Sequence, residues 1–229
     1  MPCILNIETS TDVCSVALSR DGVCAFNRER RAGMNHAESL GSFIDETLAY
    51  ADSRGWSLDA VAVSGGPGSY TGLRIGVSMA KGICYGRDVK LIAIPTLELL
   101  CVPILIEHEQ IEDDALLCPM IDARRMEVYA QVFDRSLHEV RAIGADIPDS
   151  ETYKEFLQHP VYFFGNGAAK CMDAINHPNA HLIKDVEPLA RWMFPLAEKR
   201  LAQGMTEDVA YYVPFYLKDF VAKQPKKLL

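Results

Sequence analysis

The first half of the chain changes from a strand pattern to a helix pattern. Short runs of β-branched and apolar residues, separated by polar turns, predict three strands near the amino terminus, at 4–8, 13–19 and 23–29. The segment 35–51 then shows helical periodicity. Asn35 is a candidate N-cap, Glu38 follows at the capping-box position, and Leu40 begins an apolar stripe.

Two nearly all-apolar runs, at 59–64 and 89–94, flank a helix predicted over 70–86. A strand, a helix and a strand at this spacing indicate a right-handed βαβ crossover in a parallel sheet. The first part of the chain is therefore expected to form an α/β unit.

After Pro103 the acidic stretch EHEQIEDD breaks both periodicities. We therefore expect an N-terminal lobe over 1–106, which would carry dimerisation, and a C-terminal lobe over 107–229. A return of the last segment to the N-terminal lobe is left open. In the second lobe the pattern predicts strands at 115–122, 127–134, 139–145 and 161–164, and helices at 150–158, 167–176 and near 187–203.

The two halves resemble each other. ILNIETSTDVCSVAL and CPMIDARRMEVYAQVF both run from an apolar strand through an acidic residue and a polar turn to an alternating strand. AVAVSGGPGS and VYFFGNGAA both run from an apolar strand through a glycine turn toward a helix. This repeat predicts a duplicated unit that forms two α/β lobes facing one another across a cleft.

The composition is that of an ordinary globular protein, with 49% hydrophobic and 24% charged residues. The net charge of −8 argues against a broad nucleic-acid footprint, although a local contact is compatible with it. Seven cysteines contain no C-x-x-C pair, which indicates free thiols in a reducing compartment. No segment approaches the roughly 20 apolar residues of a membrane span, so we expect a cytoplasmic protein without a membrane partner.

The motif SGGPGSYTGLRIG, residues 64–76, resembles a glycine loop around a phosphate between a strand and a helix. Its spacing fits neither a Walker loop nor a dinucleotide fingerprint. Gly66, Gly68 and Ser69 are therefore candidates for a vestigial phosphate loop. The alternative is a tight turn in which Ser69 or Thr71 caps the helix.

Small residues recur at every fourth position of the helix 70–86, at Gly72, Gly76 and Ala80. Each glycine inside a helix costs about 1 kcal/mol relative to alanine, so two of them need a packing reason. We expect this row, with Leu73 and Val77 beside it, to receive a helix of another chain. The alternative is that both faces are buried within one chain.

Other candidate chemistry is weak. The turn IETST places Glu8, Thr9, Ser10 and Thr11 at a strand end, where hydroxyls and amides could cradle phosphate, and a plain polar hairpin turn is the alternative. Gly165 and Gly167 are the corresponding candidates in the second lobe. His177 and His181 flank Pro178 in a loop pattern, so no metal site is expected, and no nucleophile–base pair points to a peptidase.

Five stretches resemble, in order and across nearly the whole chain, the TsaB (YeaZ) family: ILNIETSTDVCSVAL, GGPGSYTGLRIGVSMAKGI, PMIDARRMEVYAQVF, FFGNGA and VPFYLKDFVA. The resemblance implies the actin/Hsp70-like ATPase fold with two duplicated lobes. It also implies a non-catalytic subunit of the complex that adds threonylcarbamoyl to N6 of adenosine 37 in tRNAs reading codons that begin with A.

The resemblance further implies three partners: the catalytic paralogue TsaD, the ATPase TsaE, and tRNA through the complex. The TsaD interface would be a helix bundle from the N-terminal lobes, which places His36 and Leu40 with the glycine row. No cofactor would bind tightly, and ATP would bind only at the composite complex. An apolar helix face also predicts a homodimer when the partner is absent.

The resemblance also bears on catalysis. The catalytic relative holds its metal with a His-x-x-x-His motif, and here Thr96 and Leu100 occupy those places, with Glu98 between them. A threonine and a leucine cannot replace two imidazole ligands. Two departures from the family pattern are Glu8, where aspartate is commoner, and Lys218, where arginine is usual. The alternative function is an active ATP-binding enzyme of the kinase or ATPase type that uses the interlobe cleft.

Overall fold

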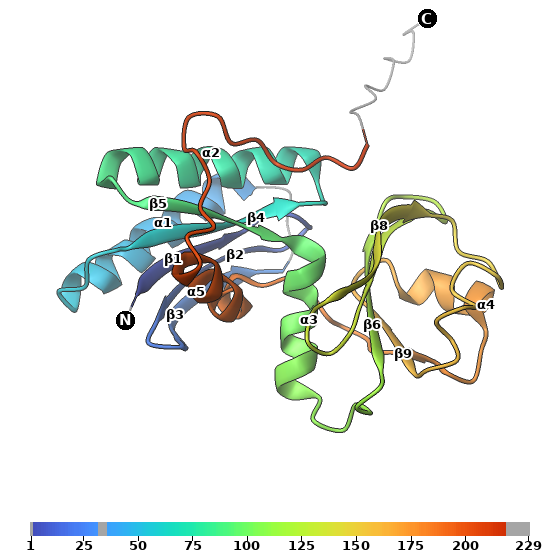
Figure 1. The fold of residues 1–229 in the computed structure, drawn as a ribbon. Coiled ribbons are helices and arrows are strands. Elements are labelled where there is room, and N and C mark those ends of the chain that lie inside the picture. Colours follow the sequence, from blue (N-terminus) through green and yellow to red (C-terminus); the bar gives the residue numbers. More distant parts are fainter. Residues whose placement is uncertain (1, 32–35, 219–229) are drawn as a thin grey trace, which may run out of the picture.

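The computed structural model describes residues 2–31 and 36–218, which form two α/β lobes side by side (Figure 1). Each lobe contains one five-stranded sheet. The first lobe holds β1 (Cys3–Glu8), β2 (Cys14–Arg20), β3 (Val23–Arg30), β4 (Ala60–Gly66) and β5 (Lys90–Pro95). The second holds β6 (Leu116–Asp122), β7 (Val128–Phe133), β8 (Glu139–Asp146), β9 (Val161–Phe164) and β10 (Ala180–Leu182).

The two sheets have the same topology, which confirms the duplication. The first has the order β3-β2-β1-β4-β5, and the second, read from its opposite edge, has the order β8-β7-β6-β9-β10. In each lobe the first three strands pair antiparallel, the fourth strand pairs in parallel with the first, and the fifth pairs in parallel with the fourth. A strand order of 3-2-1-4-5 therefore occurs twice along the chain.

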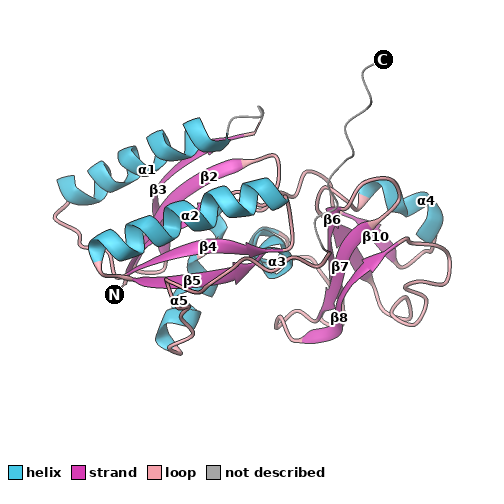
Figure 2. Ribbon diagram, turned by 90° about the horizontal axis from the view of Figure 1, so that it is seen from above, coloured by secondary structure: helices cyan, strands magenta, loops and turns pink. Residues whose placement is uncertain are grey.

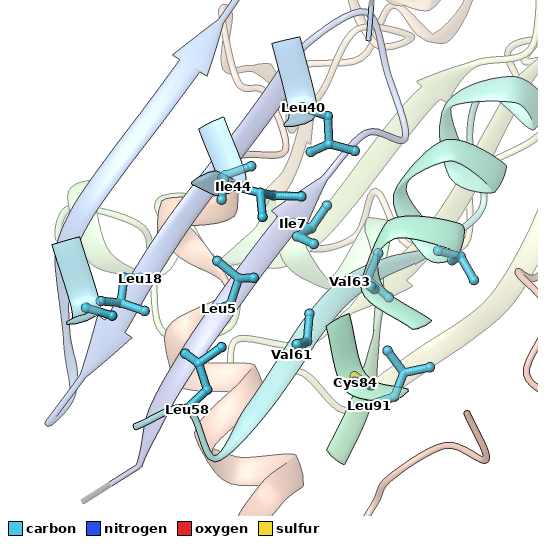
Figure 3. Close-up of a cluster of buried hydrophobic side chains, with 14 of the residues drawn as sticks. Leu5, Ile7, Leu18, Leu40, Ile44, Leu58, Val61, Val63, Cys84 and Leu91 are labelled. Atoms are coloured by element: carbon cyan, nitrogen blue, oxygen red, sulfur yellow. The ribbon is translucent and has the colours of Figure 1, made fainter. Parts of the chain in front are cut away.

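The first sheet is covered on both faces. Helices α1 (His36–Ser53) and α2 (Tyr70–Arg87) pack on one face, and α5 (Phe194–Ala202) packs on the other (Figure 2). Strand β1 is buried along its whole length, because Leu5 and Ile7 face the α1–α2 side while Ile4 faces the α5 side. This two-sided burial explains the continuous apolar runs. Figure 3 shows the core under α1 and α2.

Helix α3 (Thr96–Glu107) lies between the lobes (Figure 1). Leu99 and Val102 pack in the core of the first sheet, whereas Leu97, Leu100 and Ile104 pack with side chains of the second sheet. A helix enclosed from both sides has no polar face. It also continues through Pro103, so the chain leaves the helix only in the acidic stretch.

Three helices expected after residue 149 are absent, shortened or divided in the structure. The segment 150–158 forms consecutive turns, because hydrogen bonds such as Phe156 N to Tyr153 O link residues three apart. The segment 167–176 contains only the 3-10 turn η1 (Ala169–Cys171) and α4 (Met172–Ile175). The helix expected near 187–203 is divided into η2 (Ala190–Trp192) and α5.

The end of the described chain lies against the first lobe. After α5, Glu207 forms an isolated antiparallel bridge with Leu91 of β5, and its N–H donates to the Leu91 carbonyl at 2.8 Å. The following residues run along α2, where Lys81 Nζ donates to the carbonyls of Ala210 and Tyr212 (Figure 1).

Candidate functional site

The hairpin turn after β1 is the centre of the candidate phosphate site, and it is enclosed. Glu8, Thr9, Ser10 and Thr11 are all buried. The backbone N–H of Ser10 donates to the Glu8 carboxylate at 2.5 Å, and the Thr9 hydroxyl donates to the Gly72 carbonyl at 2.8 Å. The structure therefore brings these residues together and bonds the Thr9 hydroxyl to the chain itself. The Ser10 hydroxyl and the second Glu8 oxygen are buried without a hydrogen-bond partner among the described residues.

The glycine loop after β4 folds directly onto this turn. The Ser69 N–H donates to the Ser10 carbonyl at 2.6 Å. A Cβ added at Gly68 would overlap the backbone of Ser10, so only glycine permits this approach. Gly66 has a φ of +104° and lies against the carbonyl of Phe215, and the bond from Gly66 to Pro67 is cis. Ser69 caps α2 by accepting from the Gly72 N–H at 3.2 Å.

The row of small residues on α2 faces the same turn. A Cβ at Gly72 would overlap the carbonyl oxygen of Thr9, and one at Gly76 would overlap the Thr9 hydroxyl. These two glycines let α2 lie close against the β1–β2 turn of its own lobe. The expectation that Gly72 and Gly76 receive a foreign helix is therefore wrong, because the chain's own turn covers this face of α2. The alternative that both faces are buried within one chain is not met either, since Gly82 and Gly86 are exposed.

The other residues expected at the partner interface are also internal. Leu73, Val77, Ala80 and Leu40 are 0–4% exposed and pack toward the first sheet. The spacing of small residues at every fourth position identified one face of α2. It carried no information on which neighbouring segment packs against that face. The His36 side chain and Asn35 lie outside the part of the chain that the structure describes.

The opposite face of α2 is the one open to solvent, and sequence reasoning missed it. Ser78, Gly82 and Gly86 are exposed and also lie four apart, and a Cβ at either glycine would meet nothing within 4 Å. Tyr85, beside them, is 88% exposed. We call Ser78, Gly82, Tyr85 and Gly86 the outer α2 row. The same spacing of small residues could have identified this row in the sequence. Only the burial of each row in the structure shows that the outer α2 row is exposed and that the row at Gly72 and Gly76 is covered.

The second lobe repeats the glycine contact. A Cβ at Gly165, whose φ is +94°, would overlap the Met120 carbonyl, and one at Gly167 would overlap the backbone at the end of β6. The Gly167 N–H donates to the Met120 carbonyl at 3.0 Å. In both lobes the glycines after the fourth strand therefore bring its loop against the end of the first strand.

Glu8 is the one buried acid of the turn. Burial raises its pKa from an ordinary 4.5 to about 7, because the carboxylate is removed from water, and the hydrogen bond from the Ser10 backbone only partly opposes this. Burial therefore favours the neutral form of the Glu8 carboxyl.

Residues 96 and 100, which the family resemblance places at two metal-ligand positions, lie in the first half of α3. Thr96 and Leu100 are fully buried, and Glu98 between them forms an ion pair with Arg200 of α5 at 2.7 Å. Among the described residues, no group of three histidine, cysteine or acidic side chains could hold a metal ion. A small hollow of about 110 Å³ between α3 and residues 184–192 contains none of the phosphate-loop residues.

Within the described ranges, none of the helices combines the length and apolarity needed to cross a bilayer.

Comparisons with known proteins agree on one family. The family model described as "TsaD: tRNA N6-adenosine threonylcarbamoyltransferase" matches residues 29–226. The tRNA threonylcarbamoyladenosine biosynthesis protein TsaB of Haemophilus influenzae is 36% identical over 95% of this chain and 94% of its own length. TsaB of Escherichia coli is 28% identical over 96% of both chains.

The chain is also similar to a related transferase and to a solved structure. A tRNA N6-adenosine threonylcarbamoyltransferase of Geobacter sulfurreducens is 30% identical over 46% of this chain and 36% of its own length. The structure of YeaZ from Pseudomonas aeruginosa superposes with a TM-score of 0.77 at 24% identity, covering 95% of this chain and all of that one. The actin/Hsp70-like ATPase fold is thereby confirmed. The chain belongs to the TsaB (YeaZ) family of tRNA threonylcarbamoyladenosine biosynthesis proteins.

Proposed function

We propose that this chain is a non-catalytic dimerisation subunit of the complex that adds threonylcarbamoyl to N6 of adenosine 37 in tRNAs reading ANN codons. The observation that carries the proposal is the outer α2 row, a bare helix face on the outer side of the first lobe. Glycine and serine allow another helix to approach closely, and Tyr85 offers an exposed aromatic anchor. The occupant is a TsaD-like catalytic paralogue, which would contribute its own helices to the contact.

Two further features support a role without catalysis. Thr96 and Leu100 are buried core residues at the metal-ligand positions, so the chemistry would belong to the paralogue. The turn at residues 8–11 is buried, its Thr9 hydroxyl bonds to Gly72, and its Ser10 carbonyl accepts from the Ser69 N–H of the glycine loop. ATP would therefore bind only at the composite complex, with a TsaE-like ATPase, and tRNA would reach this chain through that complex. Alone, the same row would form a cytoplasmic homodimer.

Co-purification with the paralogue tests the proposal. Gly82→Arg adds a long charged side chain where a Cβ meets no atom, so the fold should persist while the heterodimer weakens by at least about tenfold. Ala202→Arg is the matched control, because it places the same side chain at an exposed helix end on the other side of the first sheet. A heterodimer of unchanged affinity in Gly82→Arg would show that the outer α2 row is not the interface.

A further inference from the structure

The turn between β6 and β7 carries two adjacent arginines in an uncommon backbone conformation. Arg124 and Arg125 have φ values of +76° and +52°, and both are exposed. Two successive residues with positive φ are typical of hairpin turns, where glycine, asparagine and aspartate avoid the steric cost. Arginine, which has a Cβ and a long side chain, is sterically disfavoured at both positions. Strain retained at an exposed turn points to a function of the side chains themselves.

The two carboxylates near these arginines each form an ion pair with a lysine, although the charge of Arg124 also acts on Asp122 through space. Asp122 accepts a hydrogen bond from Lys170 Nζ at 2.5 Å, and Glu127 forms an ion pair with Lys218. The Arg124 and Arg125 side chains form no hydrogen bond or ion pair with any residue in the described ranges. Four cationic side chains therefore surround two carboxylates on a protein whose net charge is −8.

The acids cannot readily exchange partners. Partial burial alone would raise the pKa of Asp122, but the hydrogen bonds from Lys170 and from the Arg124 backbone N–H lower it overall. Asp122 therefore stays ionised and bound to Lys170. Lys170 also donates to the carbonyls of Arg125 and Glu127, at 2.6 and 2.8 Å. These hydrogen bonds hold the backbone of the turn in place. The turn is thus held in place by its lysine while its two guanidinium groups face solvent.

We propose that Arg124 and Arg125 bind the phosphate backbone of RNA. Guanidinium groups pair with phosphate oxygens through two parallel hydrogen bonds, and this recognition needs no sequence information. Because the rest of the chain is acidic, the contact is local and orients the nucleic acid without producing general affinity. The inference rests on the proposed function, in which tRNA meets this chain within the complex with its catalytic paralogue.

The test uses the purified complex of this chain with its paralogue and an unmodified tRNA that reads an ANN codon. The double variant Arg124→Gly with Arg125→Gly removes both charges and suits the positive φ values, so the chain should fold at least as stably as wild type. We expect tRNA affinity to fall by about tenfold or more near 0.1 M salt. The slope of log affinity against log salt should decrease in magnitude by about 2.

Lys90→Ala with Lys199→Ala is the matched control, because it removes two exposed cations elsewhere on the first lobe and should leave affinity and slope unchanged. An intact complex of the glycine variant with unchanged tRNA affinity and slope would overturn the inference and leave the proposed function standing. Unchanged tRNA binding with loss of a protein partner would also overturn it, since the arginines would then bind an acidic protein surface. Failure of the wild-type chain to bind the paralogue would instead contradict the proposed function.

Discussion

The Thr9 hydroxyl donates a hydrogen bond to the carbonyl of Gly72 across 2.8 Å and thereby ties the end of β1 to the first turn of α2. Both groups are buried. A Cβ at residue 72 would overlap the Thr9 carbonyl oxygen. The close approach that this hydrogen bond requires is therefore possible only with glycine at residue 72. The glycine-rich motif therefore packs the start of α2 against the β1–β2 turn inside the first lobe.

Gly72→Ala should destabilise the protein by about 2 kcal/mol, because the added methyl group overlaps backbone that cannot rotate away. Gly76→Ala should cost less, since the Thr9 side chain could turn aside and lose its hydrogen bond. Gly82→Ala is the control on the same helix. Its Cβ meets open space, so it should stabilise by about 0.5–1 kcal/mol through helix propensity. Urea unfolding measures all three, and equal effects at residues 72 and 82 would contradict the close contact.

Glu8→Gln should change how stability depends on pH. In the folded protein the Glu8 pKa is about 7, above its ordinary 4.5, so the folded state binds the proton more tightly than the unfolded state. The wild type should therefore lose about 3 kcal/mol of stability as pH rises from below 4.5 to above 7. The glutamine variant should lack this loss and be the more stable protein at pH 8.

Urea unfolding at pH 5 and pH 8 provides the measurement for Glu8→Gln. Glu155→Gln, at an exposed position, is the control and should follow the wild type at both values. If Glu8→Gln loses as much stability between the two values as the wild type, the carboxyl is not buried as described.

Asp146→Ala should destabilise the second lobe by about 3 kcal/mol. Asp146 accepts two hydrogen bonds from Arg141, at 2.7 and 2.8 Å, and one from the Tyr153 hydroxyl at 2.7 Å. Its side chain is only 9% exposed, so removal leaves partly buried donors unpaired. Glu151→Ala breaks an exposed pair with Lys154 and should change stability by less than about 0.5 kcal/mol. Similar losses in both variants, measured by urea unfolding, would contradict this ranking.

Titration calorimetry of the isolated chain with magnesium and ATP should give no saturable heat at nucleotide concentrations near 1 mM. The physical reason is the bond network at the first turn, where the Ser10 carbonyl accepts from Ser69 and the Thr9 hydroxyl is bonded to Gly72. Saturable heat would favour the alternative of an active ATP-binding enzyme. Under the proposed function, the complex with the paralogue and a TsaE-like ATPase should bind ATP and provides the comparison.

Most strands were predictable because apolar and β-branched residues cluster in them between polar turns. The expected strand 4–8 is Cys3–Glu8 in the structure, and 161–164 is Val161–Phe164. The short edge strand Ala180–Leu182 was missed, because three residues carry no periodicity. The helix expected at 150–158 is wrong: Tyr153 reaches inward to Asp146 and the backbone follows in tight turns.

The sequence by itself determined the two-lobed duplication, the family and the unusual smallness of one α2 face, because hydrophobic period and glycine spacing are local properties of the chain. Only the tertiary structure decided what that face touches. Spacing of four places Gly72 with Gly76 and, equally, Gly82 with Gly86, but burial against Thr9 selects the first pair for the chain's own turn and leaves the second open. Contact partners depend on how distant segments pack, and that information is not local.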